Sequence, residues 1–188
     1  DSITRDLRKA VKASNATVVL VTQDQSGALT LCDTLAVMIN GEILQQGEPQ
    51  DIFSRPVSAE VANFVGVETI LPGKVVSKND NLCAVEAGGH KLEVVSEYGA
   101  GDSVFVCVRP EDVSISAGEE VNSMRNHFRG KIISIEPWRL EYKLGLDCGF
   151  GLIAALTRQS VEKLGLKAGV EVYASFKATA AHLIKRHI

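Results

Sequence analysis

The sequence predicts an α/β segment over residues 1–66 followed by an all-β domain over residues 67–188. Thr17-Val18-Val19-Leu20-Val21-Thr22 is an uninterrupted apolar run between two helical patterns, which is typical of a parallel strand covered on both faces. Beyond residue 67, short stretches alternate apolar and polar side chains between glycine-containing turns. That alternation is typical of strands with one buried face.

The elements of the first segment follow from apolar spacing and turn signals. Apolar residues on one face predict a helix around residues 3–11, and a second helix is expected over residues 26–33. Asn40-Gly41 is a strong two-residue turn signal, so residues 35–39 and 42–45 should form a hairpin. Two short helices should follow, the first opened by residues 47–53 and the second capped by Ser58.

The second domain contains a diverged internal repeat. It is visible in two pairs of matching segments, 70–77 with 127–134 and 100–106 with 168–174. The repeat units therefore cover about residues 70–115 and 123–185, joined by a polar linker over residues 116–122. Such a repeat predicts two similar β units that are stacked or intertwined.

Composition excludes several classes of function. The 188 residues carry a net charge of -3 with scattered basic residues, so no nucleic-acid footprint is visible. No apolar run approaches the length of a transmembrane helix, and no signal peptide opens the chain. The four cysteines and four histidines lack the spacing of metal ligands, so no metal site is predicted.

Several donor residues in the second half could hold an anion. Residues 157–160 precede a short helical run, and a hydroxyl cap there leaves backbone N–H groups available. Hydroxyl and cationic donors, with no carboxylate expected nearby, are supplied by Ser123, Arg125, Ser160, Lys177 and Thr179. The alternative is that Ser160 is only a helix cap, Lys177 a solvated strand end and Arg125 a surface charge.

Four segments of the second half, residues 123–126, 130–135, 160–169 and 174–184, resemble the small OB-like β-barrel module of molybdate- and tungstate-binding proteins, called the Mop or TOBE domain. The resemblance implies a tetrahedral oxyanion as ligand, molybdate or tungstate. The implied binding residues are Ser123, Arg125, Asn126, Thr157, Ser160, Lys177, Ala178 and Thr179.

The first repeat unit is chemically different at the matching place. Arg109-Pro110-Glu111-Asp112 stands where the second unit has residues 177–180. It resembles the accessory domain of carbohydrate importer ATPases, in which this form is mainly structural and regulatory. Glu111 and Asp112 would repel an oxyanion, so the second repeat unit is the better candidate for the anion site. Whether the first repeat unit binds anything is left open.

Residues 1–66 resemble the end of an ATP-binding cassette (ABC) ATPase domain. The resemblance rests on ordered motifs that include Leu20-Val21-Thr22-Gln23-Asp24, Asn40-Gly41-Glu42-Ile43 and Gln46-Gly47-Glu48-Pro49. It implies that Asp1 is the last residue of the D-loop and that Gln23 replaces the switch histidine, so no catalytic residue is assigned. A Gly-x-x-x-x-Gly-Lys-Ser/Thr phosphate loop, the signature motif and the Walker B carboxylates are absent from these 188 residues. Hydrolysis by this chain alone is not expected, and ATP with magnesium would bind only in a complete family ATPase.

Together these patterns predict the C-terminal portion of a molybdate/tungstate importer ATP-binding subunit with an oxyanion-binding regulatory domain. The alternatives are a free-standing cytosolic oxyanion-binding or storage protein and a ligand-free accessory domain of another importer ATPase. The expected partners are a second copy and, in the full-length context, membrane permease subunits at the cytoplasmic face. The candidate binding residues do not indicate whether the ligand is molybdate or tungstate. Why the sequence starts at Asp1 is left open.

Overall fold

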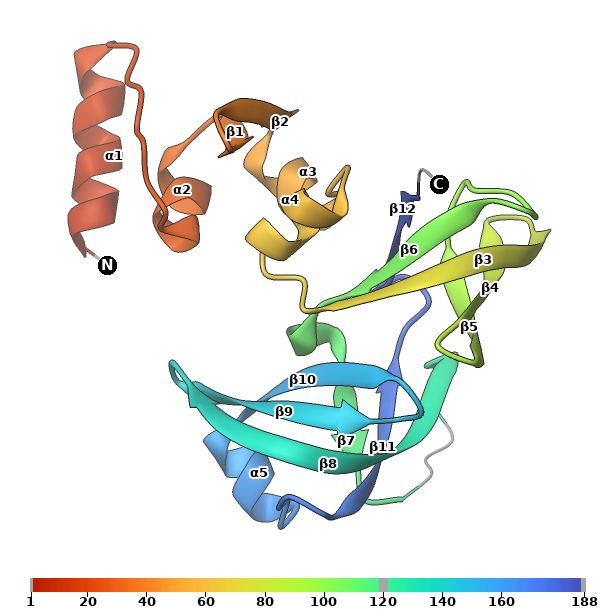
Figure 1. Ribbon diagram of the computed structural model, residues 1–188. Helices are drawn as coiled ribbons and strands as arrows, with labels where there is room; N and C mark the ends of the chain where they lie inside the picture. The colour runs from red at the N-terminus through yellow and green to blue at the C-terminus, as the bar shows by residue number, and fades with distance from the viewer. Residues whose placement is uncertain (1, 119–121, 187–188) are drawn as a thin grey trace. The chain divides into compact units, whose positions relative to one another are not determined.

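The computed structural model describes residues 2–118 and 122–186. Figure 1 shows the chain, which divides into two compact units, Asp1–Val65 and Gly66–Ile188. The first unit contains mostly helices and one hairpin, whereas the second consists mainly of antiparallel strands.

The elements of the first unit are α1 (Ser2–Ser14), α2 (Gln25–Leu31), β1 (Leu35–Ile39), β2 (Glu42–Gly47), α3 (Pro49–Ser54) and α4 (Ala59–Phe64). Local signals explain their ends. The carboxylate of Asp24 accepts hydrogen bonds from Ser26 N and Gly27 N and so caps α2. Ser58 caps α4 in the same way. Gly41, with φ of 84°, allows the tight turn between the paired strands β1 and β2.

The predicted parallel strand over residues 17–22 is wrong. These residues form no regular element, and Val19 and Val21 are 87% and 93% exposed. A parallel strand is stable only between neighbouring strands that bond its backbone and layers that cover its faces. Among the described residues of this unit the only sheet is the β1–β2 hairpin, which does not pair with this segment.

The strands of the second unit form two five-stranded antiparallel sheets, ordered β12-β6-β3-β4-β5 and β10-β9-β8-β11-β7. The elements are β3 (Thr69–Asn79), β4 (Leu82–Ala87), β5 (His90–Val95), β6 (Ser103–Val108), the 3-10 helix η1 (Pro110–Asp112), β7 (Ser114–Ser116), β8 (Asn126–Trp138), β9 (Glu141–Asp147), β10 (Gly151–Thr157), α5 (Arg158–Lys163), β11 (Glu171–Phe176) and β12 (His182–Lys185).

The two sheets repeat one another, with one exchange of strands. In each, a long strand pairs with the two strands that match, β3 with β4 and β6, and β8 with β9 and β11. Both long strands carry a register shift at the same place, between Val75 and Ser77 and between Ile132 and Ser134. The last strand of each repeat joins the other sheet, because β7 pairs with β11 and β12 pairs with β6. The repeats are therefore intertwined.

The core of the second unit is a single apolar cluster supplied by both sheets. Aromatic rings pack against one another in one part of this cluster. The His90 ring contacts Phe128 and Phe150 edge-to-face, with ring centroids 5.5 and 5.4 Å apart. The tight turn at Gly88, with φ of 58°, lies against Phe150, and a Cβ at Gly88 would lie 2.7 Å from the Phe150 Cβ. The turns of the two repeats thus contact each other directly.

No helix among the described ranges 2–118 and 122–186 has both the length and the apolar character needed to cross a membrane.

Candidate functional site

Asn126, the first residue of β8, connects three strands through its side chain. Its Oδ1 accepts a hydrogen bond from Glu93 N at 2.9 Å, and its Nδ2 donates to Glu93 O at 2.9 Å and to Phe176 O at 3.4 Å. The residue is 2% exposed. Because both amide hydrogens already have acceptors, this side chain has no donor left for an anion.

Thr69 stands at the matching position of the first repeat and makes a matching contact. It is the first residue of β3 and 2% exposed, and its Oγ1 accepts a hydrogen bond from Ile153 N of β10 at 3.1 Å. Each long strand therefore begins with a buried polar residue that bonds the edge strand of the other sheet. We call Thr69 and Asn126 the sheet latches.

Arg125 lies beside Asn126 and forms an ion pair with Glu93 of β5, at 3.0 Å between Nη1 and Oε2. The expectation that no carboxylate lies near the candidate anion residues is wrong. Glu93 is 32 residues away in the sequence. The hydrogen bonds between Asn126 at the start of β8 and Glu93 of β5 bring Glu93 next to Arg125. No local sequence signal indicates that contact.

The segment after β11 reaches the same place. Asn126 pairs with Phe176 in the β8–β11 register, so residues 123–126 and 177–179 are neighbours. Ala178 is 6% exposed, and its carbonyl accepts a hydrogen bond from Val95 N at 2.9 Å. Lys177 and Thr179 are exposed, and no ion pair of Lys177 occurs within the part of the chain that the structure describes.

Thr157 and Ser160 lie elsewhere. Thr157 caps α5 by accepting a hydrogen bond from Ser160 N at 3.2 Å, and the two side-chain oxygens are 3.0 Å apart. Thr157, not Ser160, is therefore the cap. Thr157 pairs with Glu141, which pairs with Trp138 at the opposite end of β8 from Asn126. One copy of the chain therefore holds the predicted residues in two separate clusters.

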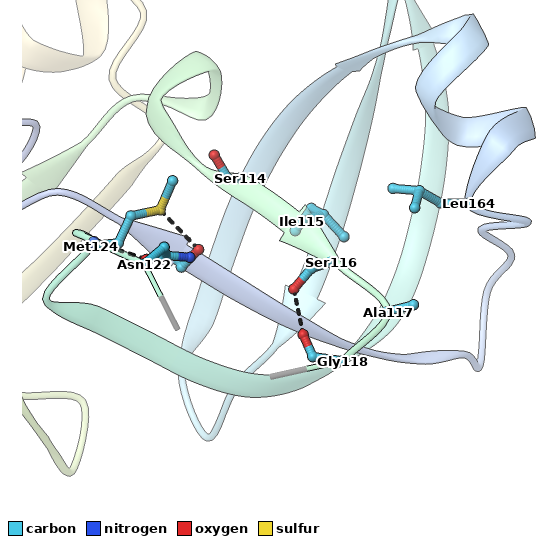
Figure 2. Close-up of a pocket in the computed structure, with 9 residues that line it drawn as sticks. Ser114, Ile115, Ser116, Ala117, Gly118, Asn122, Met124 and Leu164 are labelled. Atoms are coloured by element: carbon cyan, nitrogen blue, oxygen red, sulfur yellow. Dashed lines mark hydrogen bonds between the residues drawn. The ribbon is translucent and has the colours of Figure 1, made fainter. Parts of the chain in front are cut away.

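A pocket of about 290 Å³ opens next to residues 123–126 (Figure 2). It is lined by Ser114, Ile115, Ser116, Ala117, Gly118, Asn122, Met124, Leu164 and Ser175. Ser175 Oγ lies 3.0 Å from the sulfur of Met124, and Met124 N donates to Asn122 Oδ1 at 2.9 Å. The lining residues that the structure describes offer hydroxyl and amide groups, and none of them carries a charged side chain. Arg125 follows Met124 in the sequence and supplies the nearest cation along the chain.

Sequence reasoning missed the pocket residues. Ser175 alternates with the apolar residues Ala174 and Phe176, a pattern that favours the exposed face of β11, yet it is 6% exposed. Its contact with Met124, in the segment just before β8, explains this burial. The predicted residue Ser123 was the one sequence signal that pointed to the pocket. Ser123 itself is exposed, but its neighbours Asn122 and Met124 line the pocket.

The corresponding place in the first repeat is acidic. Arg109 forms an ion pair with Glu111 at 3.4 Å. Burial, and to a lesser degree the charge of Glu111, raises the pKa of the Asp112 carboxyl above its usual range, while Arg109 acts in the opposite direction. The carboxylates here are poor neighbours for an anion.

Other candidate chemistry is not assembled in the described ranges. No group of three or more potential metal-ligating side chains occurs in the residues that were placed. Gln23 is exposed between α1 and α2, and Asp1 lies outside the described residues.

Residues 122–183 match the TOBE domain family. The chain is 36% identical over 181 residues to the molybdate/tungstate import ATP-binding protein WtpC of Pyrococcus horikoshii, covering 95% of this chain and 50% of that protein. It is also 37% identical over 130 residues to the spermidine/putrescine import ATP-binding protein PotA of Acetivibrio thermocellus, covering 69% of this chain and 34% of that protein.

The chain also resembles a solved structure, that of the cytoplasmic molybdate-binding protein ModG with molybdate bound. The TM-score is 0.56 at 23% sequence identity, and the match covers 64% of this chain and 97% of that one. At this identity the likeness concerns the fold.

Residues 122–183, which include most of the second of the two intertwined repeats, form a TOBE domain. Over 85–95% of its length the chain is similar to the C-terminal region of molybdate/tungstate import ATP-binding proteins. It spans about half the length of the molybdate/tungstate relatives that it matches.

Proposed function

We propose that the chain is the C-terminal portion of a molybdate or tungstate importer ATP-binding subunit and that its second unit binds the oxyanion. The observation that carries the proposal is the 36% identity to the Pyrococcus horikoshii protein, which extends over 95% of the chain and therefore includes both units. The fold shared with ModG and the donor residues around Arg125 and Lys177 support it.

The anion site is proposed to be completed by two copies of the chain. Ser123, Arg125, Lys177 and Thr179 would come from one copy, and the Thr157–Ser160 helix entry from the other. The separation of these two clusters at opposite ends of β8 supports this arrangement. Backbone N–H groups near Asn126 and Ala178 would add donors, while the side chain of Asn126 holds the strands in place.

The first unit is proposed to be a fragment of the ABC ATPase domain. In that setting ATP and magnesium would be bound only by the complete subunit, which would sit on the cytoplasmic face of the membrane against its permease subunits. The match to import ATP-binding proteins along the first unit supports this assignment.

Calorimetric titration with molybdate and tungstate tests the proposal. Lys177→Ala and Ser160→Ala should each weaken binding by about tenfold or more, because each removes a donor from a desolvated dianion. Arg109→Ala, in the acidic first repeat, should leave the affinity unchanged. A folded sample that binds neither oxyanion at concentrations on the order of millimolar would contradict the proposal.

The second candidate is an accessory domain of a polyamine importer that binds no oxyanion. The 37% identity to the Acetivibrio thermocellus PotA protein favours it. In that case molybdate would produce no heat, and the full-length protein would couple ATP hydrolysis to a spermidine-loaded system instead.

A further inference from the structure

The carboxylate of Glu93 lies where an incoming oxyanion would bind Arg125. Its Oε2 is 3.0 Å from Arg125 Nη1, and the two side chains are 35% and 57% exposed. Solvent therefore reaches the pair, and the arginine can change partners.

The position of Glu93 does not depend on the ion pair alone. The amide of Asn126 bonds both the N–H and the carbonyl of Glu93, each at 2.9 Å, so the backbone that carries the carboxylate is fixed. Asn126 also donates to Phe176 O, one residue before Lys177. Glu93 is thus held next to Arg125, and the same amide bonds the backbone one residue before Lys177.

We propose that Glu93 is an internal competitor for the oxyanion and that it sets the affinity of the site. The inference rests on the proposed function. A dianion that binds Arg125 competes with the Glu93 carboxylate for the guanidinium, and the carboxylate stays close and repels the bound charge. Both effects weaken binding without any change in the size of the site.

This role predicts a selectivity pattern. Molybdate and sulfate are both dianions, so the carboxylate opposes both to a similar degree. Removal of its charge should strengthen the binding of both and leave their affinity ratio unchanged. A residue that shapes the pocket would instead change the ratio.

Glu93→Gln removes the charge and keeps the size and the backbone contacts with Asn126. The matched control is Glu171→Gln, because Glu171 of β11 forms the same kind of exposed pair with Arg129 of β8. Both variants change the net charge equally, but Glu171 pairs with Lys131 in the β8–β11 register, away from Arg125.

We expect Glu93→Gln to bind molybdate and sulfate about three- to tenfold more tightly than the unaltered protein in about 20 mM salt. The gain should shrink in about 0.5 M salt, where charges are screened over a few ångströms. Glu171→Gln should show no gain.

The outcomes separate the two proposals. Binding by Glu93→Gln alone, or tighter binding than the unaltered protein, supports the inference. Equal affinities, an equal gain in Glu171→Gln or a changed molybdate-to-sulfate ratio overturn it while leaving oxyanion binding intact. Absence of binding by every protein, with unchanged melting temperatures, overturns both proposals.

Discussion

The sheet latches contribute to stability through single buried side chains. Asn126→Ala would leave Glu93 N–H, Glu93 O and Phe176 O without their partner in a site that is 2% exposed. We expect a loss of about 2–3 kcal/mol in the free energy of unfolding, measured by urea denaturation.

Asn122→Ala is the matched control. Asn122 is exposed and accepts one hydrogen bond from Met124 N, so its replacement should cost less than about 1 kcal/mol. Equal losses in the two variants would contradict the role assigned to Asn126.

Two buried thiols predict a loss of stability in alkaline solution. Burial raises the pKa of Cys107 to about 12 and that of Cys148 to about 11, from the ordinary value of 9.0. The unfolded chain ionises these thiols as the pH passes 9.0, whereas the folded protein keeps them protonated. Their contribution is therefore full below 9.0 and is lost as the pH rises toward 11–12.

At a pH of about 10 the loss should be about 1 kcal/mol for each thiol. It is measured as the difference in unfolding free energy between about pH 8 and about pH 10. The double variant Cys107→Ala, Cys148→Ala should lose less over this interval than the unaltered protein. An identical loss in both would show that other groups cause the alkaline destabilisation.

Residue-level chemistry was only partly predictable from the sequence. The cap position before α5 was visible because capping is a local effect, although Thr157 and not Ser160 occupies it. The Arg125–Glu93 pair and the burial of Ser175 were not visible, because both depend on contacts between strands that are distant in the sequence.

At the scale of elements, the β4–β5 turn tests the contact between the repeats. Gly88 and Gly89 are neighbours with φ of 58° and 78°, but only Gly88 faces another side chain, at Phe150. Gly89→Ala should cost about 1 kcal/mol through its backbone conformation alone. Gly88→Ala should cost about 2–4 kcal/mol, because the new methyl group also collides with Phe150.

Chemical denaturation of the two single variants measures this difference. A Gly88→Ala protein as stable as Gly89→Ala would mean that the turns of the two repeats do not pack as the structure has them.

The exposed run between α1 and α2 should be the first site of proteolysis. Residues 17–22 form no hydrogen-bonded element, and their valine and leucine side chains suit elastase. Brief digestion followed by mass spectrometry should find cleavage there before any cleavage in β6, which has a similar sequence but lies inside a sheet. Initial cleavage inside β6 would contradict this assignment.

The helices and strands that could be predicted from the sequence are those whose signals lie within a few residues. The β1–β2 hairpin and the helices α2 to α4 were predictable, because turn residues and caps act within a few positions. Residues 17–22 have the composition of a buried strand, but composition cannot supply the neighbouring strands that such a segment needs.

At the scale of the whole molecule, we expect the chain to form a dimer. The two donor clusters at opposite ends of β8 and the exposed apolar run in the first unit both favour association. Light scattering at tens of micromolar should report twice the mass of 20.2 kDa. A monomer at that concentration that still binds molybdate would show that one copy suffices.

The internal repeat was readable in the sequence because the matching segments keep their order and spacing. The exchange of β7 and β12 was not readable. Stacked and intertwined repeats have the same apolar pattern along each strand, and only the pairing of the last strands distinguishes them.

That exchange has a consequence for synthesis on the ribosome. The sheet built on β3 begins with the early residues of the second unit, yet its edge strand β12 ends at Lys185. Until that late segment leaves the exit tunnel, β6 lacks its second neighbour and exposes unpaired backbone groups to other nascent chains. The first repeat must therefore wait for the second, and the vulnerable interval, from Val108 to Lys185, lasts for more than half of the translation of the unit.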